Sequence, residues 1–281
     1  MTTSAAEVGT TAAPAAPALR RPSRASRAVR TILPPLVGVG GFLLLWQLLV
    51  TVLDIPQFEL PAPSAILRHI ASDPSFYITN ARVTLWEAFL GFLLGLAGAL
   101  AVATIMAHSR FIEQAVTPLA VLVQVTPLIA YAPALVIWLG FGLKPILVGT
   151  ALVCFVPFLF NAVVGFRSID SATHELLRSV DASRREVFLR LRVPHALPYL
   201  FSAARIAVGL ALIGAVLTEF FAGVTSGLGY AVKQAQAFNL ALQLWGSIFV
   251  LAFLGATATI LIGVLERVAL RWHSSQDPAR P

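Results

Sequence analysis

The segment from Glu175 to Pro194, ELLRSVDASRREVFLRLRVP, combines charged and apolar residues in a pattern suited to binding another surface. It carries five arginines, although the chain on either side is strongly apolar. Ser183, followed three residues later by Glu186, forms a capping-box pattern, which predicts that a helix starts there. We expect a helix, a turn and a second helix, with Pro194 and Pro198 interrupting the path into the next apolar run. Its arginines would either rest on anionic lipid or fix the segment in a groove on another protein.

Other reactive residues in the sequence form no recognisable catalytic or metal-binding pattern. The five histidines lack HExxH or similar ligand spacing, and no acidic residues of the 167–197 loop are paired as an acid and a base. The only two lysines follow Leu143 and Val232, so the chain has no Gly-Lys and no P-loop for ATP phosphates. The single cysteine, Cys154, lies in an apolar run and is expected to be a small buried residue. We therefore expect no enzymatic activity and no cofactor bound by this chain.

The composition predicts an all-α integral membrane protein. Of the 281 residues, 58% are hydrophobic and 12% charged, whereas soluble domains have about 45–50% apolar and about 25% charged residues. A span needs about 20 mostly apolar residues, and helices satisfy their own backbone hydrogen bonds in lipid. Six spans are expected at about residues 32–53, 83–107, 115–139, 146–166, 198–222 and 244–265. The third contains Pro118, Pro127 and Pro133 and is expected to be kinked or broken.

The two ends of the chain are expected to flank one transmembrane domain. Residues 1–30 are rich in Ala, Pro, Thr and Ser, which predicts a disordered tail. The first apolar run is longer than that of a secretory signal, so we interpret it as an uncleaved span. The transmembrane domain is expected at 31–272, with a connecting loop at 167–197 and a second tail at 273–281.

The distribution of basic residues predicts the orientation. If the N-terminus is cytoplasmic, fifteen of the 20 basic residues fall on the cytoplasmic side. The outer loops then hold only Arg68, Lys144 and Lys233. This bias follows the positive-inside rule and predicts that both termini and the 167–197 loop face the cytoplasm. Nucleic-acid binding is not expected, because the arginines lie beside apolar runs rather than on a separate basic domain.

Small and polar residues within the spans suggest helix packing and a solute pathway. Gly91 and Gly95 are spaced as GxxxG, followed by Gly98, and we expect them to pack helices inside one subunit rather than at a dimer seam. Five polar residues set in apolar runs are candidates for lining a pathway, or for hydrogen bonding between helices: Gln124, Tyr131, Asn161, Thr218 and Glu219. An ion-coupled secondary transporter is one possible class, and such proteins use acidic residues or histidines deep in the membrane. The first, third, fourth and sixth expected spans have no such residue in their interiors, which argues against this class.

The segment at 175–194 also resembles the EAA loop of binding-protein-dependent ABC importer permeases. Glu175 matches the glutamate of that pattern, and the stretch Leu191 to Pro194 matches its final hydrophobic-x-Leu-Pro in character. The sequence departs from the pattern at the two alanines and the glycine, where it has Leu176, Leu177 and Asp181. Four further stretches resemble the nitrate, sulfonate and taurine branch of the family: Leu60–Ile66, Gln124–Gly142, Phe155–Asp170 and Gly227–Tyr230.

The resemblance implies a type I ABC importer permease fold, with about six transmembrane helices, in the bacterial inner membrane. In this family the EAA loop is a coupling helix that docks in a cleft of the ATPase subunit. It implies as partners two ATPase copies carrying ATP and Mg, a second permease copy forming a homodimer, an extracytoplasmic substrate-binding protein and membrane lipid. The first expectation for the solute is an alkanesulfonate, taurine or nitrate; the alternative is a thiamine-precursor pyrimidine or riboflavin-type vitamin. The coupling residues would be Glu175, Leu176, Leu177, Asp181, Ser183, Arg184, Arg185, Glu186, Leu191 and Pro194.

Overall fold

The computed structural model describes residues 24–168 and 183–270, which form helices joined by short connections and contain no strand. The chain divides into two units, residues 1–49 and 50–281, and helix α1 (Arg24–Val52) crosses the division. Its part from Leu33 to Val52 is long and apolar enough to span a membrane, as expected for the first span. α1 begins at Arg24, so the last residues of the tail expected at 1–30 are part of this helix. Ala and Arg, which dominate RASRAVR, are good helix formers and extend the helix.

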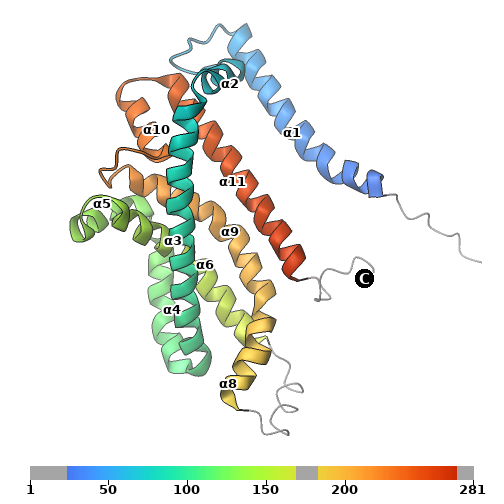
Figure 1. The fold of residues 1–281 in the computed structure, drawn as a ribbon, viewed down its shortest axis with the longest axis vertical. Coiled ribbons are helices and arrows are strands. Elements are labelled where there is room, and N and C mark those ends of the chain that lie inside the picture. Colours follow the sequence, from blue (N-terminus) through green and yellow to red (C-terminus); the bar gives the residue numbers. More distant parts are fainter. Residues whose placement is uncertain (1–23, 169–182, 271–281) are drawn as a thin grey trace, which may run out of the picture. The chain divides into compact units, whose positions relative to one another are not determined.

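The second unit is a set of long helices with short helices between them (Figure 1). α3 (Pro74–His108), α6 (Leu143–Arg167), the continuous helix from Phe188 to Glu219, and α11 (Ala241–Ala269) each have the length and hydropathy of a span. The continuous helix consists of the π-helical turn η1 (Phe188–Arg192) and α9 (Val193–Glu219). The remaining elements are α2 (Pro63–Ser72), α4 (Arg110–Val125), α5 (Leu128–Leu139), α8 (Arg184–Val187) and α10 (Leu228–Ala237).

The expected break in the third span is confirmed. The chain bends by 103° between α4 and α5, across a short break at Thr126 and Pro127. Thr126 is extended (φ −79°, ψ 120°), the conformation that a following proline favours. Among its described residues, the protein therefore has five helices that could span a membrane, or six if the bent pair counts as one span.

Small residues hold α3, α6 and α9 together at the core of this unit. A Cβ atom added at Gly95 of α3 would lie 2.7 Å from the backbone oxygen of Ala151 and 2.8 Å from Cβ of Cys154, both on α6. One added at Gly214 of α9 would lie 2.9 Å from Cα of Thr150. The helices thus approach closely only because these positions lack side chains. The GxxxG pair therefore packs within the subunit, as expected.

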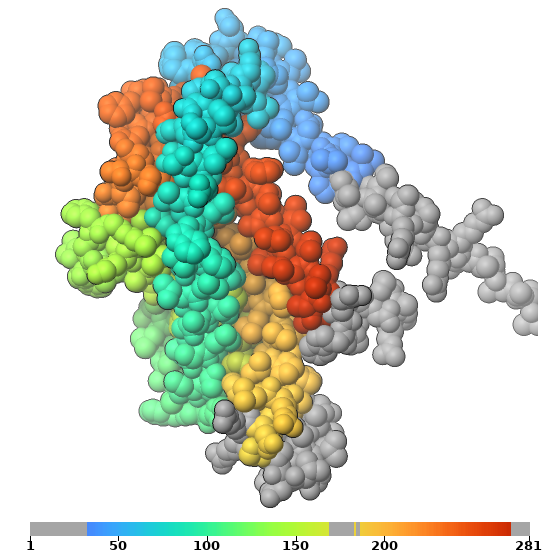
Figure 2. Space-filling view, in the orientation of Figure 1, coloured from blue at the N-terminus to red at the C-terminus, as the bar shows by residue number. Residues whose placement is uncertain are grey.

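The two ends of the second unit carry different short elements. α2 and α10 lie at one end, which we call the α10 end, and α8 lies at the opposite end together with the turn between α3 and α4 (Figures 1 and 2). The start of α3 at the α10 end is capped by Asp73, which accepts hydrogen bonds from the Ser75 hydroxyl (2.8 Å) and the Phe76 amide (3.1 Å). These two bonds lower the pKa of Asp73. The sequence reading missed α2, α10 and the first turns of α3, because they lack a long apolar run.

Candidate functional site

The described part of the coupling segment begins with the expected capping box. The Ser183 amide and hydroxyl both donate to Oε2 of Glu186, at 3.1 and 2.8 Å, and the Glu186 amide donates to the Ser183 hydroxyl at 3.3 Å. The bond from the Ser183 hydroxyl, followed by that from its amide, lowers the pKa of Glu186. The sequence pattern therefore correctly located a helix start at α8.

Four of the expected coupling residues lie outside the described residues: Glu175, Leu176, Leu177 and Asp181. The first helix and the turn of the segment therefore stay a prediction. Arg184 and Arg185 form the first turn of α8. Leu191 is buried, with 8% of its surface exposed, and Pro194 lies in the first turn of α9.

The expected interruption at Pro194 and Pro198 is wrong. The chain stays helical from α8 through η1 into α9, and it passes both prolines. A proline has no amide hydrogen and its ring collides with the carbonyl four residues earlier. Just before Pro194 the helix widens into a π turn, in which the Val193 amide donates to the Phe188 carbonyl oxygen. This wider turn and the place of Pro194 at the start of α9 let the helix continue.

Aromatic contacts and one ion pair fix the α8 end. The Phe188 ring packs against Phe166 of α6 and His108 of α3, with ring centroids 5.3 and 5.9 Å apart. Arg167 donates from Nη1 to both carboxylate oxygens of Glu113 on α4, each at 2.7 Å, and from Nη2 to the Met106 carbonyl oxygen at 3.0 Å. The ends of α3, α4 and α6 are therefore tied together beside the coupling segment.

The predicted pathway residues are spread over four helices. Gln124 is exposed near the end of α4, and Tyr131 is half-buried in α5. Asn161 donates to the Pro157 carbonyl oxygen at 2.9 Å, and Thr218 donates to that of Gly214 at 2.8 Å, each within its own helix. Their role in a pathway stays a prediction. Glu219, the last residue of α9, has a set of partners that sequence reasoning missed.

The Glu219 carboxylate is buried, with 1% exposure, and joins three elements. Its Oε1 accepts from the hydroxyl of Thr84 on α3 at 2.7 Å. Its Oε2 accepts from the amides of Gly229 and Tyr230, in the first turn of α10, at 2.7 and 3.1 Å. A carboxylate at a helix N-terminus satisfies amides that have no partner within the helix.

Side chains of α3 bind two further amides of the segment Gly227–Tyr230, whose sequence is GLGY. The Thr84 hydroxyl accepts from the Leu228 amide at 2.7 Å, and the Asn80 side-chain oxygen accepts from the Gly227 amide at 2.8 Å. Gly227 has φ +117°, a conformation that L-residues rarely adopt. Glu87 of α3 is also buried and lies against the Glu219 carboxyl group. We call Asn80, Thr84, Glu219 and the four amides of Gly227–Tyr230 the α10 anchor.

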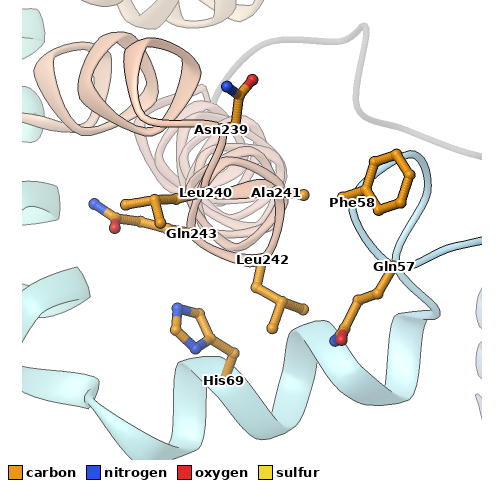
Figure 3. Close-up of a pocket in the computed structure, with 8 residues that line it drawn as sticks. All are labelled: Gln57, Phe58, His69, Asn239, Leu240, Ala241, Leu242 and Gln243. Carbon is orange, nitrogen blue, oxygen red and sulfur yellow. The ribbon is translucent and has the colours of Figure 1, made fainter.

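A pocket of about 430 Å³ lies beyond the far end of α10. It is lined by Gln57 and Phe58 of the α1–α2 connection, by His69 of α2, and by residues 239–243 at the start of α11. Figure 3 shows the Leu242 side chain pointing from the start of α11 toward the space between His69 and Gln57, whereas the Asn239 side chain points away from it. Its polar groups and its exposed Phe58 ring could contact either a solute or a protein surface.

Residues 91–273 match a protein family whose description is binding-protein-dependent transport system inner membrane component. The chain belongs to this family. The match covers the coupling segment, Glu219 and the GLGY stretch, so both ends of α9 fall within the family's shared region. This permease is therefore a membrane-spanning component of ABC import systems, as the resemblance implied.

Individual relatives agree with this assignment. The permease is 34% identical over 235 residues to the riboflavin transport system permease protein RibX of Chloroflexus aurantiacus, covering 83% of this chain and 87% of that protein. It is 26% identical over 237 residues to the putative aliphatic sulfonates transport permease protein SsuC of Bacillus subtilis, covering 83% and 85%. A solved chain of the MetNI methionine ABC transporter shares the fold, with a TM-score of 0.58, 17% identity, and coverage of 66% of this chain and 92% of that one.

Proposed function

We propose that this permease is the translocating subunit of an ATP-driven importer, and that two ATPase subunits dock on the segment 175–194 of two permease copies. The capped start of α8 carries this proposal, because its charged residues lie on a helix that continues into the Phe188–Glu219 span. ATP and Mg would be bound by the ATPase, since this chain has no Gly-Lys and no P-loop. The permease would therefore be no enzyme itself and would receive its energy through the docked segment.

The gathering of basic residues supports a cytoplasmic position for the α8 end. Basic residues begin α4, end α6, lie in η1 and lie in the last turn of α11: Arg110, Arg167, Arg190, Arg192 and Arg267. In a bacterial inner membrane the positive-inside rule orients this end toward the cytoplasm, with both termini. The substrate-binding protein would then dock at the α10 end, where the pocket of Figure 3 opens.

The contacts of Glu219 speak against the ion-coupled alternative. Both of its carboxylate oxygens accept hydrogen bonds from the protein, at Thr84 and at the start of α10. A carboxylate used to bind a travelling ion or proton needs access to a water-filled cavity. Glu219 is almost fully buried, so a structural role explains its position better.

Two classes of solute follow from the relatives. We expected a small oxyanion such as an alkanesulfonate, taurine or nitrate, and the sulfonate relative supports this class. The riboflavin relative is more similar to this chain, at 34% identity against 26%. This observation favours the vitamin alternative, which includes thiamine-precursor pyrimidines. Uptake assays should therefore test riboflavin and a pyrimidine precursor beside taurine, an alkanesulfonate and nitrate.

Replacing Glu175 by arginine tests the docking role. We expect Glu175→Arg to insert into the membrane normally but to lose both co-purification with the ATPase and solute uptake, because a reversed charge opposes docking. The matched control is Glu59→Arg, the same substitution at an exposed position at the α10 end, which should keep the ATPase bound. Normal ATPase recovery with Glu175→Arg would contradict the docking assignment. Labelling of Ser183→Cys from outside the cell would contradict the orientation.

A further inference from the structure

One continuous helix connects the coupling segment to the α10 anchor. It runs from Phe188 to Glu219 over 32 residues. Its first residues follow the capping box of α8 directly, and its last residue is the central acceptor of the anchor. A tilt of this helix at the α8 end must therefore displace Glu219 at the α10 end.

The α10 anchor binds the start of α10 to side chains of two long helices, α3 and α9. All four amides from Gly227 to Tyr230 donate to side chains of α3 or α9. A Cβ atom at Gly229 would lie 2.8 Å from Oε2 of Glu219, so the backbone approaches the carboxylate closely. If α10 moved away from α3 and α9, these buried amides and the carboxylate would lose their partners, which is strongly unfavourable. Lys233 adds a bond from α10 to the Phe220 carbonyl oxygen at 2.6 Å.

The other end of α10 leads straight into the pocket of Figure 3. α10 ends at Ala237, and residues 239–243 line the pocket. A protein surface that presses on this pocket therefore acts on a short helix whose opposite end is bound to Glu219. The described part of the coupling segment, α9, the anchor, α10 and the pocket form one connected series of elements.

We propose that Thr84 and Glu219 are positioning residues that make α10 follow α9, so that docking of the binding protein at the α10 end controls ATP hydrolysis at the α8 end. This inference rests on the proposed function. The anchor itself touches neither nucleotide nor the ATPase, so it should affect the coupling between the two ends rather than hydrolysis as such.

The test measures ATP hydrolysis by the full complex in lipid nanodiscs, with and without its solute-loaded binding protein. Thr84→Val removes the hydroxyl that links Glu219 to Leu228 and keeps the side-chain shape. We expect it to leave basal hydrolysis unchanged and to lower the stimulation by the binding protein at least about fivefold, the lower end of typical coupling factors. Thr84→Ser should restore the stimulation. Thr104→Val is the matched control, because among the described residues the Thr104 hydroxyl bonds the Leu100 carbonyl oxygen of its own helix and no other helix.

A second variant keeps the inference testable if Thr84→Val does not assemble. Asn80→Leu removes the acceptor of the Gly227 amide and should lower stimulation in the same direction. The inference is overturned if an assembled anchor variant keeps wild-type stimulation, or if basal and stimulated rates fall in proportion, as a purely structural role requires. If the wild-type complex shows no stimulation by a binding protein, the proposed function fails as well.

Discussion

Gly95→Ala should lower the stability of the permease, because the added methyl group would overlap atoms of α6. A Cβ atom there would lie 2.7 Å from the Ala151 carbonyl oxygen, 2.8 Å from Cβ of Cys154 and 3.3 Å from the Phe155 amide nitrogen. Favourable contacts between carbon atoms lie at about 3.5–4.0 Å. Two of these three neighbours are backbone atoms of α6, which cannot rotate away as a side chain can. Gly95→Ala must therefore push α3 and α6 apart.

The expected loss in the free energy of unfolding is about 1–3 kcal/mol, the usual cost of overpacking. In water, Ala would regain about 0.5–1 kcal/mol over Gly within a helix. That gain is small for a span, since the helix persists in the membrane before the helices associate. Because 1.4 kcal/mol corresponds to a factor of ten, the ratio of folded to unfolded permease should fall by about 5- to 150-fold.

Gly98→Ala provides the matched control on the same helix. Its added Cβ would lie 3.7 and 3.9 Å from the Phe155 ring, which is ordinary contact, so its stability should stay within about 0.5 kcal/mol of wild type. Both variants can be compared by reversible SDS unfolding in mixed micelles. The packing argument is refuted if Gly95→Ala is as stable as wild type, or if Gly98→Ala is the weaker of the two.

Two further contacts give predictions of their own. Arg205 of α9 pairs with Glu266 of α11 at 2.5 Å, so Glu266→Gln should lower the free energy of unfolding by about 1 kcal/mol. Adding Arg205→Gln should cost little more, and additive losses in this double-mutant cycle would show that the pair does not interact. The capping box lowers the pKa of Glu186, so its stabilisation of α8 is present above the ordinary glutamate pKa and is lost as pH falls through the lowered value. The Val187 amide donates to the Ser183 carbonyl oxygen at 3.0 Å, so its protection from hydrogen exchange should fall over the same pH range in which α8 loses this stabilisation. Glu186→Gln should show no such pH dependence.

The sequence predicted the features that depend on local pattern. Long apolar runs located the spans, the prolines located the break at Pro127, and Ser183 with Glu186 located the start of α8. Each signal is contained within a few residues or one continuous run. α2 and α10 were missed for the same reason, since each has 10 residues and lies below the length that a search for spans detects.

Contacts between distant segments left no trace in the sequence pattern. Arg167 and Glu113 are 54 residues apart, and Glu219 and Thr84 are 135 apart. Counting charges placed Arg167 on the same side as the coupling segment but could not supply its partner. Glu219 stood out as an acidic residue in an apolar run, yet its role depends on α10, which the sequence did not reveal.

The tight core also limits where a solute pathway can lie. A Cβ atom at Gly149 of α6 would lie 2.6 Å from the Thr218 hydroxyl of α9, so these helices interlock at the α10 end as well as in their middle. Helices packed this closely leave no room for a channel between them in this structure. Asn161 and Thr218, which bond within α6 and α9, fit helix packing better than solute contact. We infer that the pathway runs along the faces of α4 and α5 outside this core, where Gln124 and Tyr131 lie beside the break at Pro127, and that it opens by movement of one subunit's core against that of a second copy.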